Sequence, residues 1–332
     1  MRFGVRLPHS GPFASKAAID QMATAAERLG YDAVMVHDHV QWGDFDRYHF
    51  YAGSVEAVDG LERATDFFEA HAVLAYLAAK VPRLRLIPAS MVLGWRDPTM
   101  VARLASSLDH LSEGRYVLSV CAGNVKKDFE VSGVPWEERG KRTEESLKII
   151  GKLLKRDGPQ SHEGKFWNLQ DVELFPKSPD IKIWYGGQSD AALRRTARFA
   201  DGWLVGGSAD FYREKVPAIH RIAKEKYDRE FELEVGCLSP TSIAATDAAA
   251  QAVAEATVRK RQEEADWLKR THNPRDIGGA NLVGSPETII AKVREFESAG
   301  VDYIGMGFIG HSVDELVDEM TLFARKVIPV FA

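Results

Sequence analysis

The pattern that decides the fold is most compact in Glu27-Arg28-Leu29-Gly30-Tyr31-Asp32-Ala33-Val34-Met35-Val36. Before Gly30, apolar residues recur at the three- and four-residue spacing of an amphipathic helix. Gly30 is suited to the left-handed conformation in which many helices end. Residues 33–36 are continuously apolar, as expected for a strand of a parallel sheet that is buried on both faces. The same helix–glycine–acid–strand unit recurs at residues 297–303.

Outward from this unit, the chain alternates between short apolar runs and amphipathic segments. Strands are predicted at residues 3–7, 33–36, 84–87, 116–120, 181–185, 202–205, 233–237 and 303–306. Helices are predicted at residues 19–29, 67–77, 98–111, 135–154, 190–199, 211–227, 246–270 and 313–326, and another begins at Ser285-Pro286-Glu287, a serine cap followed by proline. Eight strands, nearly all followed by helices, favour a closed TIM-type (β/α)8 barrel over an open sheet, as one domain spanning residues 1–332.

The composition excludes several classes of protein. Hydrophobic residues make up 45% and charged residues 27% of the 332 residues, which allows a large core. The formal net charge of -5 argues against nucleic acid as the main partner. The two cysteines, Cys121 and Cys237, provide neither a disulfide framework nor a thiolate zinc site. With no signal-peptide core and no apolar run of about twenty residues, we expect a soluble, cytoplasmic protein that has no contact with membranes.

Two segments are longer than packing requires. Residues 151–182 are rich in Gly, Pro and Lys, and we expect a small hairpin around residues 162–167. Residues 239–285 separate the seventh strand from its return helix. Long connections of this kind often form lids or binding loops, although the polar helix within this one fits a solvated surface equally well.

The second strand ends in His37-Asp38-His39, where a barrel places its active site. In an extended chain His37 and His39 point to one face and Asp38 to the other. One interpretation is a His-x-His metal site, but among later strand ends only His311 could add a histidine ligand, so the set is incomplete and no metal is assigned. The other makes His39 a proton donor or base at the barrel mouth, with Asp38 fixing the geometry. Hydrogen-bonded core histidines remain the alternative, more so for His37.

The fifth strand runs into Gly186-Gly187-Gln188-Ser189 and a helix. Two glycines let the backbone approach an anion, and the amides of a helix N-terminus attract negative charge. The alternative is a plain turn capped by serine. We expect the arginines of the following helix to be solvated; they are Arg194, Arg195 and Arg198.

Two further motifs are interpreted structurally. Residues 305–310 fit G-x-G-x-x-G after a strand, but no βαβ unit follows before Ala332, so we reject a dinucleotide site and expect a tight loop at the barrel mouth. Cys121 has no His or Asn partner placed by a motif and is interpreted as a small apolar filler.

Four stretches together resemble the luciferase-like flavin-dependent oxidoreductases: residues 26–39, 108–115, 133–140 and 186–203, with a shorter match at 284–287. The resemblance implies a TIM-type barrel that binds FMN or the deazaflavin coenzyme F420 with its ring at the mouth, and often a homodimer. It matches Asp38-His39 to a strand-two pair whose histidine lies near the reactive ring edge, and it matches the loop Gly186-Gly187-Gln188-Ser189 to the one that holds the cofactor phosphate. It also implies a non-prolyl cis peptide bond between Ser90 and Met91 that supports the ring.

The end of the fourth strand departs from this pattern. Many members have a glycine-rich stretch there with a tryptophan or a carboxylate, whereas this chain has Cys121-Ala122-Gly123-Asn124. The resemblance still places Gly123 and Asn124 beside the cofactor, but a possible acid next to the substrate is missing.

Two features favour F420 over FMN. Lys126-Lys127 can meet the oligoglutamate tail of F420, and Asp38-His39-x-x-Trp42 resembles the deazaflavin branch. We therefore expect hydride transfer between F420 and a small organic substrate, with His39, Asp38 and Trp42 as catalytic residues. Alternatives are a monooxygenase that uses reduced FMN and O2 with a separate flavin reductase, a metal-dependent barrel hydrolase, and a flavin-binding protein without catalysis.

Overall fold

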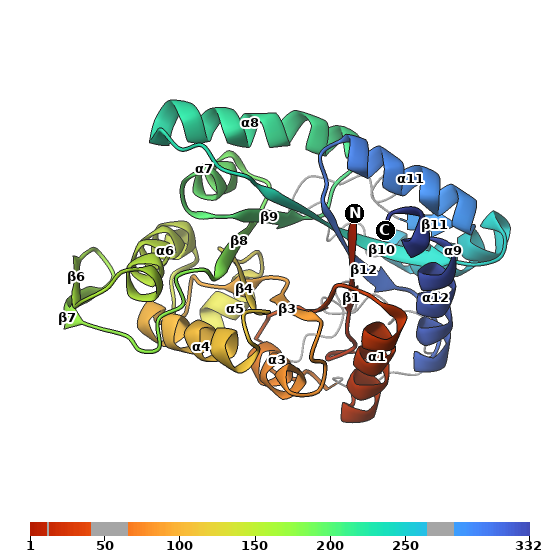
Figure 1. The fold of residues 1–332 in the computed structure, drawn as a ribbon, viewed down its shortest axis with the longest axis horizontal. Helices are drawn as coiled ribbons and strands as arrows, with labels where there is room; N and C mark the ends of the chain where they lie inside the picture. Colours follow the sequence, from red (N-terminus) through yellow and green to blue (C-terminus); the bar gives the residue numbers. More distant parts are fainter. Residues whose placement is uncertain (12, 41–65, 264–281) are drawn as a thin grey trace.

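The computed structural model describes residues 1–11, 13–40, 66–263 and 282–332. Their central feature is a parallel sheet with the strand order β3-β2-β1-β12-β10-β9-β8-β5-β4, in which β11 pairs with β10 (Figure 1). The strands are β1 (Arg2–Arg6), β2 (Ala33–Val36), β3 (Arg85–Pro88), β4 (Met91–Val92), β5 (Val117–Cys121), β8 (Lys182–Gly186), β9 (Gly202–Val205), β10 (Glu234–Ile243), β11 (Leu282–Gly284) and β12 (Tyr303–Phe308).

The two ends of this sheet meet, and the predicted barrel is confirmed. β3 pairs with β2, whereas β4, three residues further on, pairs with β5. A bridge between Leu86 and Tyr116 joins β3 to the start of β5, with the Leu86 amide donating to the Arg115 carbonyl at 3.0 Å. The eight predicted strands are β1, β2, β3, β5, β8, β9, β10 and β12, and the short β4 and β11 were not predicted.

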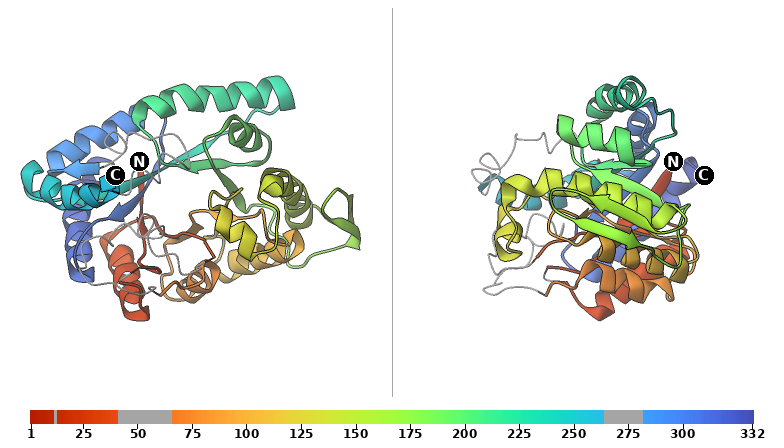
Figure 2. Two further views of the ribbon diagram at one scale, coloured as in Figure 1. Left: turned by 180° about the vertical axis from the view of Figure 1, so that it is seen from behind. Right: turned by 90° about the vertical axis from the view of Figure 1, so that its left-hand side faces the viewer.

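Helices cover the outside of the barrel (Figures 1 and 2). They are α1 (Lys16–Leu29), α3 (Ala70–Ala78), α4 (Pro98–Leu111), α6 (Arg139–Lys155), α7 (Asp190–Phe199), α8 (Ala209–Tyr227), α9 (Asp247–Glu263), α11 (Pro286–Ser298) and α12 (Val313–Lys326). The predicted caps are present: Gly30 ends α1 at φ 82°, and the Ser285 hydroxyl accepts from Thr288 at the start of α11. Phe67 lies before α3, outside the helix that was predicted to include it.

Large side chains fill the barrel interior near the amino ends of the strands. Trp184, Tyr303, Met35 and Leu204 belong to this buried inner cluster. Glu234 closes that end: its carboxylate lies 2.7 Å from the Arg2 guanidinium and 3.2 Å from that of Arg85, and it accepts from the Trp184 indole at 3.0 Å. The amino-end side of the interior is therefore filled by these side chains and closed by the contacts of Glu234.

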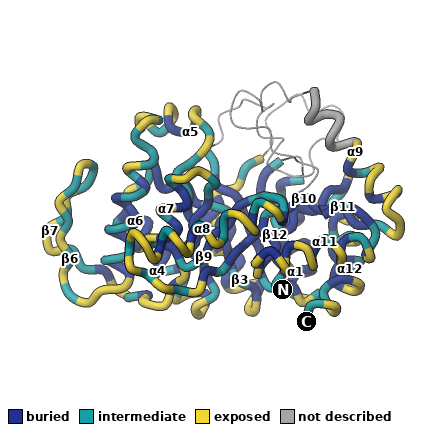
Figure 3. The backbone as a smooth tube through the Cα atoms, turned by 90° about the horizontal axis from the view of Figure 1, so that it is seen from above, coloured by how far each residue is buried: buried dark blue, intermediate teal, exposed yellow. Residues whose placement is uncertain are grey.

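The insertions follow the sequence expectations in part. β6 (Gln160–Glu163) and β7 (Asn168–Val172) form the predicted hairpin, which projects beyond α6 (Figure 1). The short helices α5 (Lys126–Val131) and η2 (Trp136–Glu138) precede α6, and η3 (Ile328–Val330) follows α12. Figure 3 shows α5 at the side of the molecule opposite both termini, which is the side of the carboxyl ends of the strands.

Two predictions for the last third of the chain need correction. β10 continues to Ile243 because it pairs with both β12 and β11, so residues 239–243 belong to the barrel and not to an excursion. Within the rest of the segment, residues 247–263 form α9 and residues 282–284 form β11, and residues 264–281 lie outside the described residues. Gly305 and Gly307 lie within β12 and not in a loop, because β12 stays paired with β10 as far as Phe308. Among the described helices, none combines the length and the apolar character needed to cross a membrane.

Candidate functional site

Small residues line the barrel mouth. Side chains alternate along a strand, so Ile87, Trp184, Leu204 and Tyr303 of the inner layer are followed, at the inward positions nearer the mouth, by Ala89, Gly186, Gly206 and Gly305 with Gly307. An added β-carbon at Gly186 would lie 2.9 Å from the Ser90 hydroxyl. Bulky side chains thus fill the closed end of the barrel, whereas glycine and alanine occupy these inward positions at the open end.

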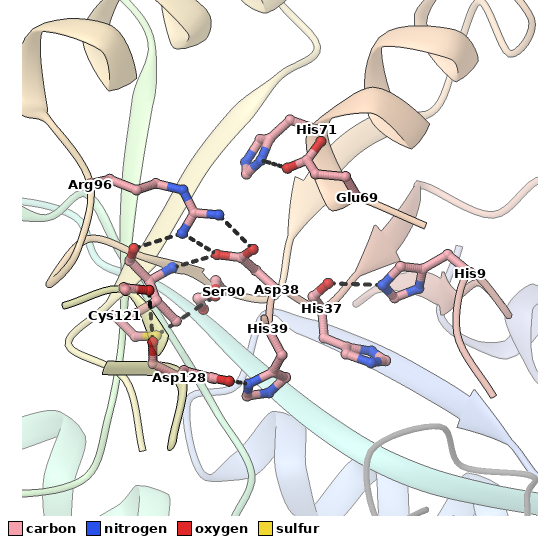
Figure 4. A network of polar contacts seen from close by, with 12 residues as sticks. His9, His37, Asp38, His39, Glu69, His71, Ser90, Arg96, Cys121 and Asp128 are labelled. Atoms are coloured by element: carbon pink, nitrogen blue, oxygen red, sulfur yellow. Dashed lines mark hydrogen bonds and ion pairs between the residues drawn. The ribbon is translucent and has the colours of Figure 1, made fainter. Parts of the chain in front are cut away.

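His39 stands at this mouth in contact with a carboxylate (Figure 4). Its Nδ1 lies 2.9 Å from Oδ2 of Asp128, and the two side chains are 7% and 1% exposed. An ionised carboxylate only accepts hydrogen bonds, so Nδ1 carries the proton and Nε2 is the nitrogen that can gain or lose a second one. A buried carboxylate that orients an imidazole in this way is a common arrangement for general acid–base catalysis.

Asp128 supplies a carboxylate close to the end of β5, the fourth predicted strand, where the sequence Cys121-Ala122-Gly123-Asn124 has none. It comes from α5, four residues after Asn124, and its neighbour Phe129 is fully buried. The Phe129 ring packs edge-to-face on Trp95 at 5.0 Å and on Trp136 at 5.3 Å. This aromatic cluster fixes the short α5 against the mouth and thereby positions Asp128.

Asp38 points the other way, as the alternation along the strand predicts (Figure 4). Its two carboxylate oxygens accept from the Arg96 guanidinium at 2.7 and 2.8 Å, and Oδ2 also accepts from the Val92 amide at 2.8 Å. Arg96 in addition donates to the Val92 carbonyl at 2.8 Å. Asp38 therefore ties β2 to β4 and the loop after it, behind the mouth, and does not contact the imidazole of His39 through any of these bonds.

His37 and His9 form a buried pair beside His39. The His37 ring lies 4.3 Å from that of His9 and 5.9 Å from that of His39. Its Nδ1 faces an Arg6 guanidinium nitrogen at 3.4 Å and its Nε2 faces the Ser10 hydroxyl at 2.9 Å. Arginine only donates, so Nδ1 accepts and His37 is neutral. Burial lowers the pKa of His37 well below its usual value and that of His9 to about 4.

These contacts do not support the metal interpretation. Both ring nitrogens of His37 are engaged by other groups, and the cationic Arg6 stands where a metal ion would approach. Within the residues that the structure describes, no group of three or more His, Cys, Asp or Glu side chains is arranged to hold a metal ion. A metal-dependent hydrolase is therefore not favoured.

The non-prolyl cis peptide bond exists but lies one residue earlier than the resemblance implied, between Ala89 and Ser90. At this point the chain changes its partner: the Ala89 amide still donates to Val36 of β2 at 2.7 Å, whereas Met91 is in register with Val120 of β5. The Ser90 hydroxyl lies 2.8 Å from that of Ser119, and Met91 is fully buried. Ser90 borders the mouth, and Met91 belongs to the core.

The predicted phosphate loop connects β8 to α7. Gly187 has φ 135°, and the Trp203 indole donates to its carbonyl at 2.9 Å. The Gln188 amide donates to the Gly206 carbonyl and so joins the ends of β8 and β9. The Ser189 hydroxyl caps α7 by accepting from Ala192 at 3.2 Å. The loop combines two glycines, which leave the backbone accessible, with an exposed helix N-terminus. This combination suits an anion.

The remaining predicted residues lie around the same mouth. Gly123 has φ 88°, and an added β-carbon would meet the Phe129 ring at 2.7 Å, so packing alone requires glycine there. Asn124 is exposed in the loop before α5. Cys121 is partly exposed, and burial of its thiol raises the pKa to about 12, as expected for a filler. Trp42 lies outside the described residues.

Sequence reasoning missed Asp128 and Arg96. Arg96 comes from a loop, and α5 has only six residues, too few for a helical period to stand out. The available signal was indirect. A buried histidine at a strand end needs a hydrogen-bond partner, and Asp128 follows β5, whose end has no carboxylate where many family members have one.

Comparisons with known proteins agree with this fold and identify the family. The model of the luciferase-like monooxygenase family matches residues 1–303. An uncharacterised protein of Mycobacterium tuberculosis is 34% identical over 226 residues, covering 67% of this chain and 74% of that protein. The FMNH2-dependent dimethylsulfone monooxygenase of Pseudomonas putida is 27% identical over 282 residues, 76% of each chain. The structure of an F420-dependent secondary alcohol dehydrogenase with an F420–acetone adduct superimposes with a TM-score of 0.77 at 18% identity, over 100% of this chain and 99% of that one.

Proposed function

Since this chain belongs to the luciferase-like monooxygenase family, we propose that it is an oxidoreductase that uses coenzyme F420 to transfer a hydride to or from a small organic substrate. The observation that carries the proposal is the buried His39–Asp128 pair beside a mouth lined by small residues. The pair can donate and accept a proton, and the small residues leave these strand ends without bulky side chains of their own.

The residues present fit a phosphorylated flavin or deazaflavin. Ser90, Gly186 and Gly206 border the mouth without large side chains, so a planar ring can approach the strand ends. The loop of Gly187, Gln188 and Ser189 would hold the phosphate through backbone amides at the start of α7. When bound, such a cofactor supplies or accepts the hydride.

The protein's own part is then binding and proton transfer. His39 takes a proton from a substrate hydroxyl at Nε2 when the substrate is oxidised, and returns one when it is reduced. Asp128 keeps the proton on Nδ1 and offsets the positive charge that forms on the ring. Asp38 and Arg96 act behind the mouth by holding the chain on either side of Ser90.

F420 is proposed over FMN because the exposed Lys126 and Lys127 open α5 next to the mouth, where an acidic tail could extend. FMN-dependent monooxygenation, with a flavin reductase as partner, is the second candidate because a relative that is 27% identical is an FMNH2-dependent monooxygenase. A homodimer in the cytoplasm and a role for Trp42 stay predictions.

A parallel titration tests the proposal. The purified protein is titrated with F420 and with FMN, in both oxidised and reduced forms, and absorbance and fluorescence are recorded. We expect tighter binding of F420 and turnover of F420 with simple secondary alcohols or ketones. Oxygen consumption that depends on reduced FMN would replace this proposal with the second candidate, and binding of neither cofactor would reject both.

A further inference from the structure

Arg6 carries a cationic side chain into the barrel mouth. It is the last residue of β1 and lies two positions after Gly4, where an added β-carbon would meet the hydroxyl of Tyr303 in the buried inner cluster. Because side chains alternate along a strand, Arg6 points into the barrel as well, one layer nearer the carboxyl ends. It is partly exposed, so its guanidinium reaches the open end of the barrel.

Arg6 lies between a histidine and a glycine of the two neighbouring strands. On the side of β2, a guanidinium nitrogen lies 3.4 Å from Nδ1 of His37. On the side of β12, an added β-carbon at Gly307 would be 3.5 Å from a guanidinium nitrogen and 3.6 Å from the δ-carbon of Arg6. A larger residue at position 307 would therefore extend over the Arg6 side chain, whereas glycine places no side chain there.

The arginines at the closed end of the barrel have a different environment. Arg2 and Arg85 share the carboxylate of Glu234, at 2.7 and 3.2 Å, and this contact holds the amino ends of the strands together. Arg6 instead donates to the imidazole of His37, which is neutral because burial lowers its pKa well below the usual value. A neutral imidazole orients the guanidinium but does not offset its charge, so this contact preserves a cation at the mouth.

His39 also lies next to His37. The rings of the two histidines are 5.9 Å apart, and both project from the end of β2 to the side opposite Asp38 (Figure 4). Arg6 and His39 are therefore neighbours of one imidazole. The first is a fixed positive charge and the second exchanges a proton at Nε2, so a small molecule with a carboxylate close to a hydroxyl or carbonyl finds a partner for each group.

We propose that Arg6 binds the carboxylate of an anionic substrate and that the protein therefore acts on small hydroxy acids or on the corresponding oxo acids. The inference rests on the proposed function, because the cofactor and His39 carry out the redox step. A guanidinium suits a carboxylate because the two form a pair of parallel, charge-assisted hydrogen bonds.

Arg6 takes no part in making or breaking bonds. When a hydroxy acid is oxidised, the C–H bond at the hydroxyl-bearing carbon breaks, and its electron pair leaves with the hydrogen as a hydride to the oxidised cofactor. The hydroxyl proton passes to Nε2 of His39, and the carbon–oxygen double bond forms. The carboxylate stays on Arg6 throughout, where it fixes the reacting carbon with respect to His39.

The experiment compares each acid with its amide, which keeps the shape but has no charge. The substrates are 2-hydroxy acids with methyl, isobutyl and benzyl side chains and their amides, oxidised with F420 by the wild type, Arg6→Met, Arg6→Lys and Arg194→Met. We expect the wild type to prefer an acid over its amide by about tenfold or more in kcat/KM. Arg6→Met should lower kcat/KM by about tenfold or more for that acid and by less than about threefold for the amide.

Two of these variants serve as controls. Arg6→Lys keeps the charge but not the paired hydrogen bonds, so it should retain part of the preference for the acid. Arg194→Met removes an exposed arginine of α7 and the same amount of charge, so it should leave kcat/KM of both compounds within about twofold. Turnover of the amide shows in addition that each variant is folded.

The outcomes separate this inference from the proposed function. Turnover of neutral alcohols with no preference for acids, or equal losses for acid and amide in Arg6→Met, would overturn the carboxylate site and leave the proposed function in place. If the wild type binds neither F420 nor FMN, the proposed function fails. In that case, or if no compound is turned over, calorimetric titration of the same acids and amides decides on the site. Binding of an acid that is lost in Arg6→Met but kept in Arg194→Met would support it, and binding of no acid, or binding that Arg6→Met retains, would overturn it.

Discussion

Nδ1 of His39 lies 2.9 Å from Oδ2 of Asp128, although the two residues are 89 positions apart and come from the ends of different strands. His39 follows β2, and Asp128 belongs to the short α5 that follows β5. The contact gives the imidazole a fixed orientation and gives the chain a carboxylate at the position where the end of β5 has none. It is the relationship on which the proposed chemistry depends.

Replacing His39 should separate catalysis from binding. We expect His39→Ala to lower kcat by about 10² to 10⁴, because general acid–base catalysis contributes that much. Cofactor affinity should change little, because the phosphate loop lies on the other side of the mouth. Steady-state kinetics and cofactor titration of the same preparation provide the measurement, and an unchanged kcat would remove His39 from the mechanism.

Asp128 is expected to act through His39 as a positioning residue. Asp128→Asn keeps the shape but removes the charge, so kcat should fall by about 10²-fold with KM nearly constant. Nitrogen-15 NMR of the histidine rings should show a loss of the Nδ1-protonated form of His39. A stability loss with normal kcat and an unaltered tautomer would show that Asp128 has only a structural role.

Gly187 should be required for cofactor binding. Its φ of 135° and the Ala192 methyl, 2.9 Å from an added β-carbon, exclude larger residues. We expect Gly187→Val to weaken cofactor affinity at least tenfold. Gly30→Val is the matched control, since Gly30 also has a positive φ of 82° but has nothing within 4 Å of an added β-carbon. Equal affinity of the Gly187→Val protein and the wild type would reject the phosphate loop.

The Asp38–Arg96 ion pair should contribute to stability. Removing one partner leaves an uncompensated charge, and Asp38 is only 4% exposed. Arg96→Met should therefore lower the free energy of unfolding by about 3 kcal/mol. Denaturant unfolding measures this loss, and the double variant Asp38→Asn/Arg96→Met should lose less than the sum of the two single variants. Strict additivity would contradict the pairing.

Stability should fall on acidification because of the buried His9. Burial lowers its pKa from 6.5 to about 4, so between these pH values the unfolded chain binds a proton that the folded chain does not. The stabilisation is present above pH 6.5 and is lost as the pH falls toward 4, by up to about 3 kcal/mol for this group. Unfolding free energies at pH 7 and 4.5 should differ less in His9→Asn than in the wild type, and an equal difference would contradict the assignment.

Residue patterns in the sequence determined the barrel and part of its site. Apolar runs, glycine caps and serine caps are local signals, and they located α4, α7 and α12 at the residues observed. The alternation along a strand likewise placed His37 and His39 on one face and Asp38 on the other. These features depend on residues that are close in the chain, so a pattern can reveal them.

Only the tertiary structure decided which side chains meet. The Asp128 carboxylate reaches His39 because a buried cluster of aromatic rings holds α5 at the mouth, and the Arg195 guanidinium is partly buried because α6 begins beside it at Gly140. The cis peptide bond likewise lies at Ala89–Ser90, between β3, which pairs with β2, and β4, which pairs with β5. Contacts between distant segments depend on how whole elements pack, and that packing is not contained in any local pattern.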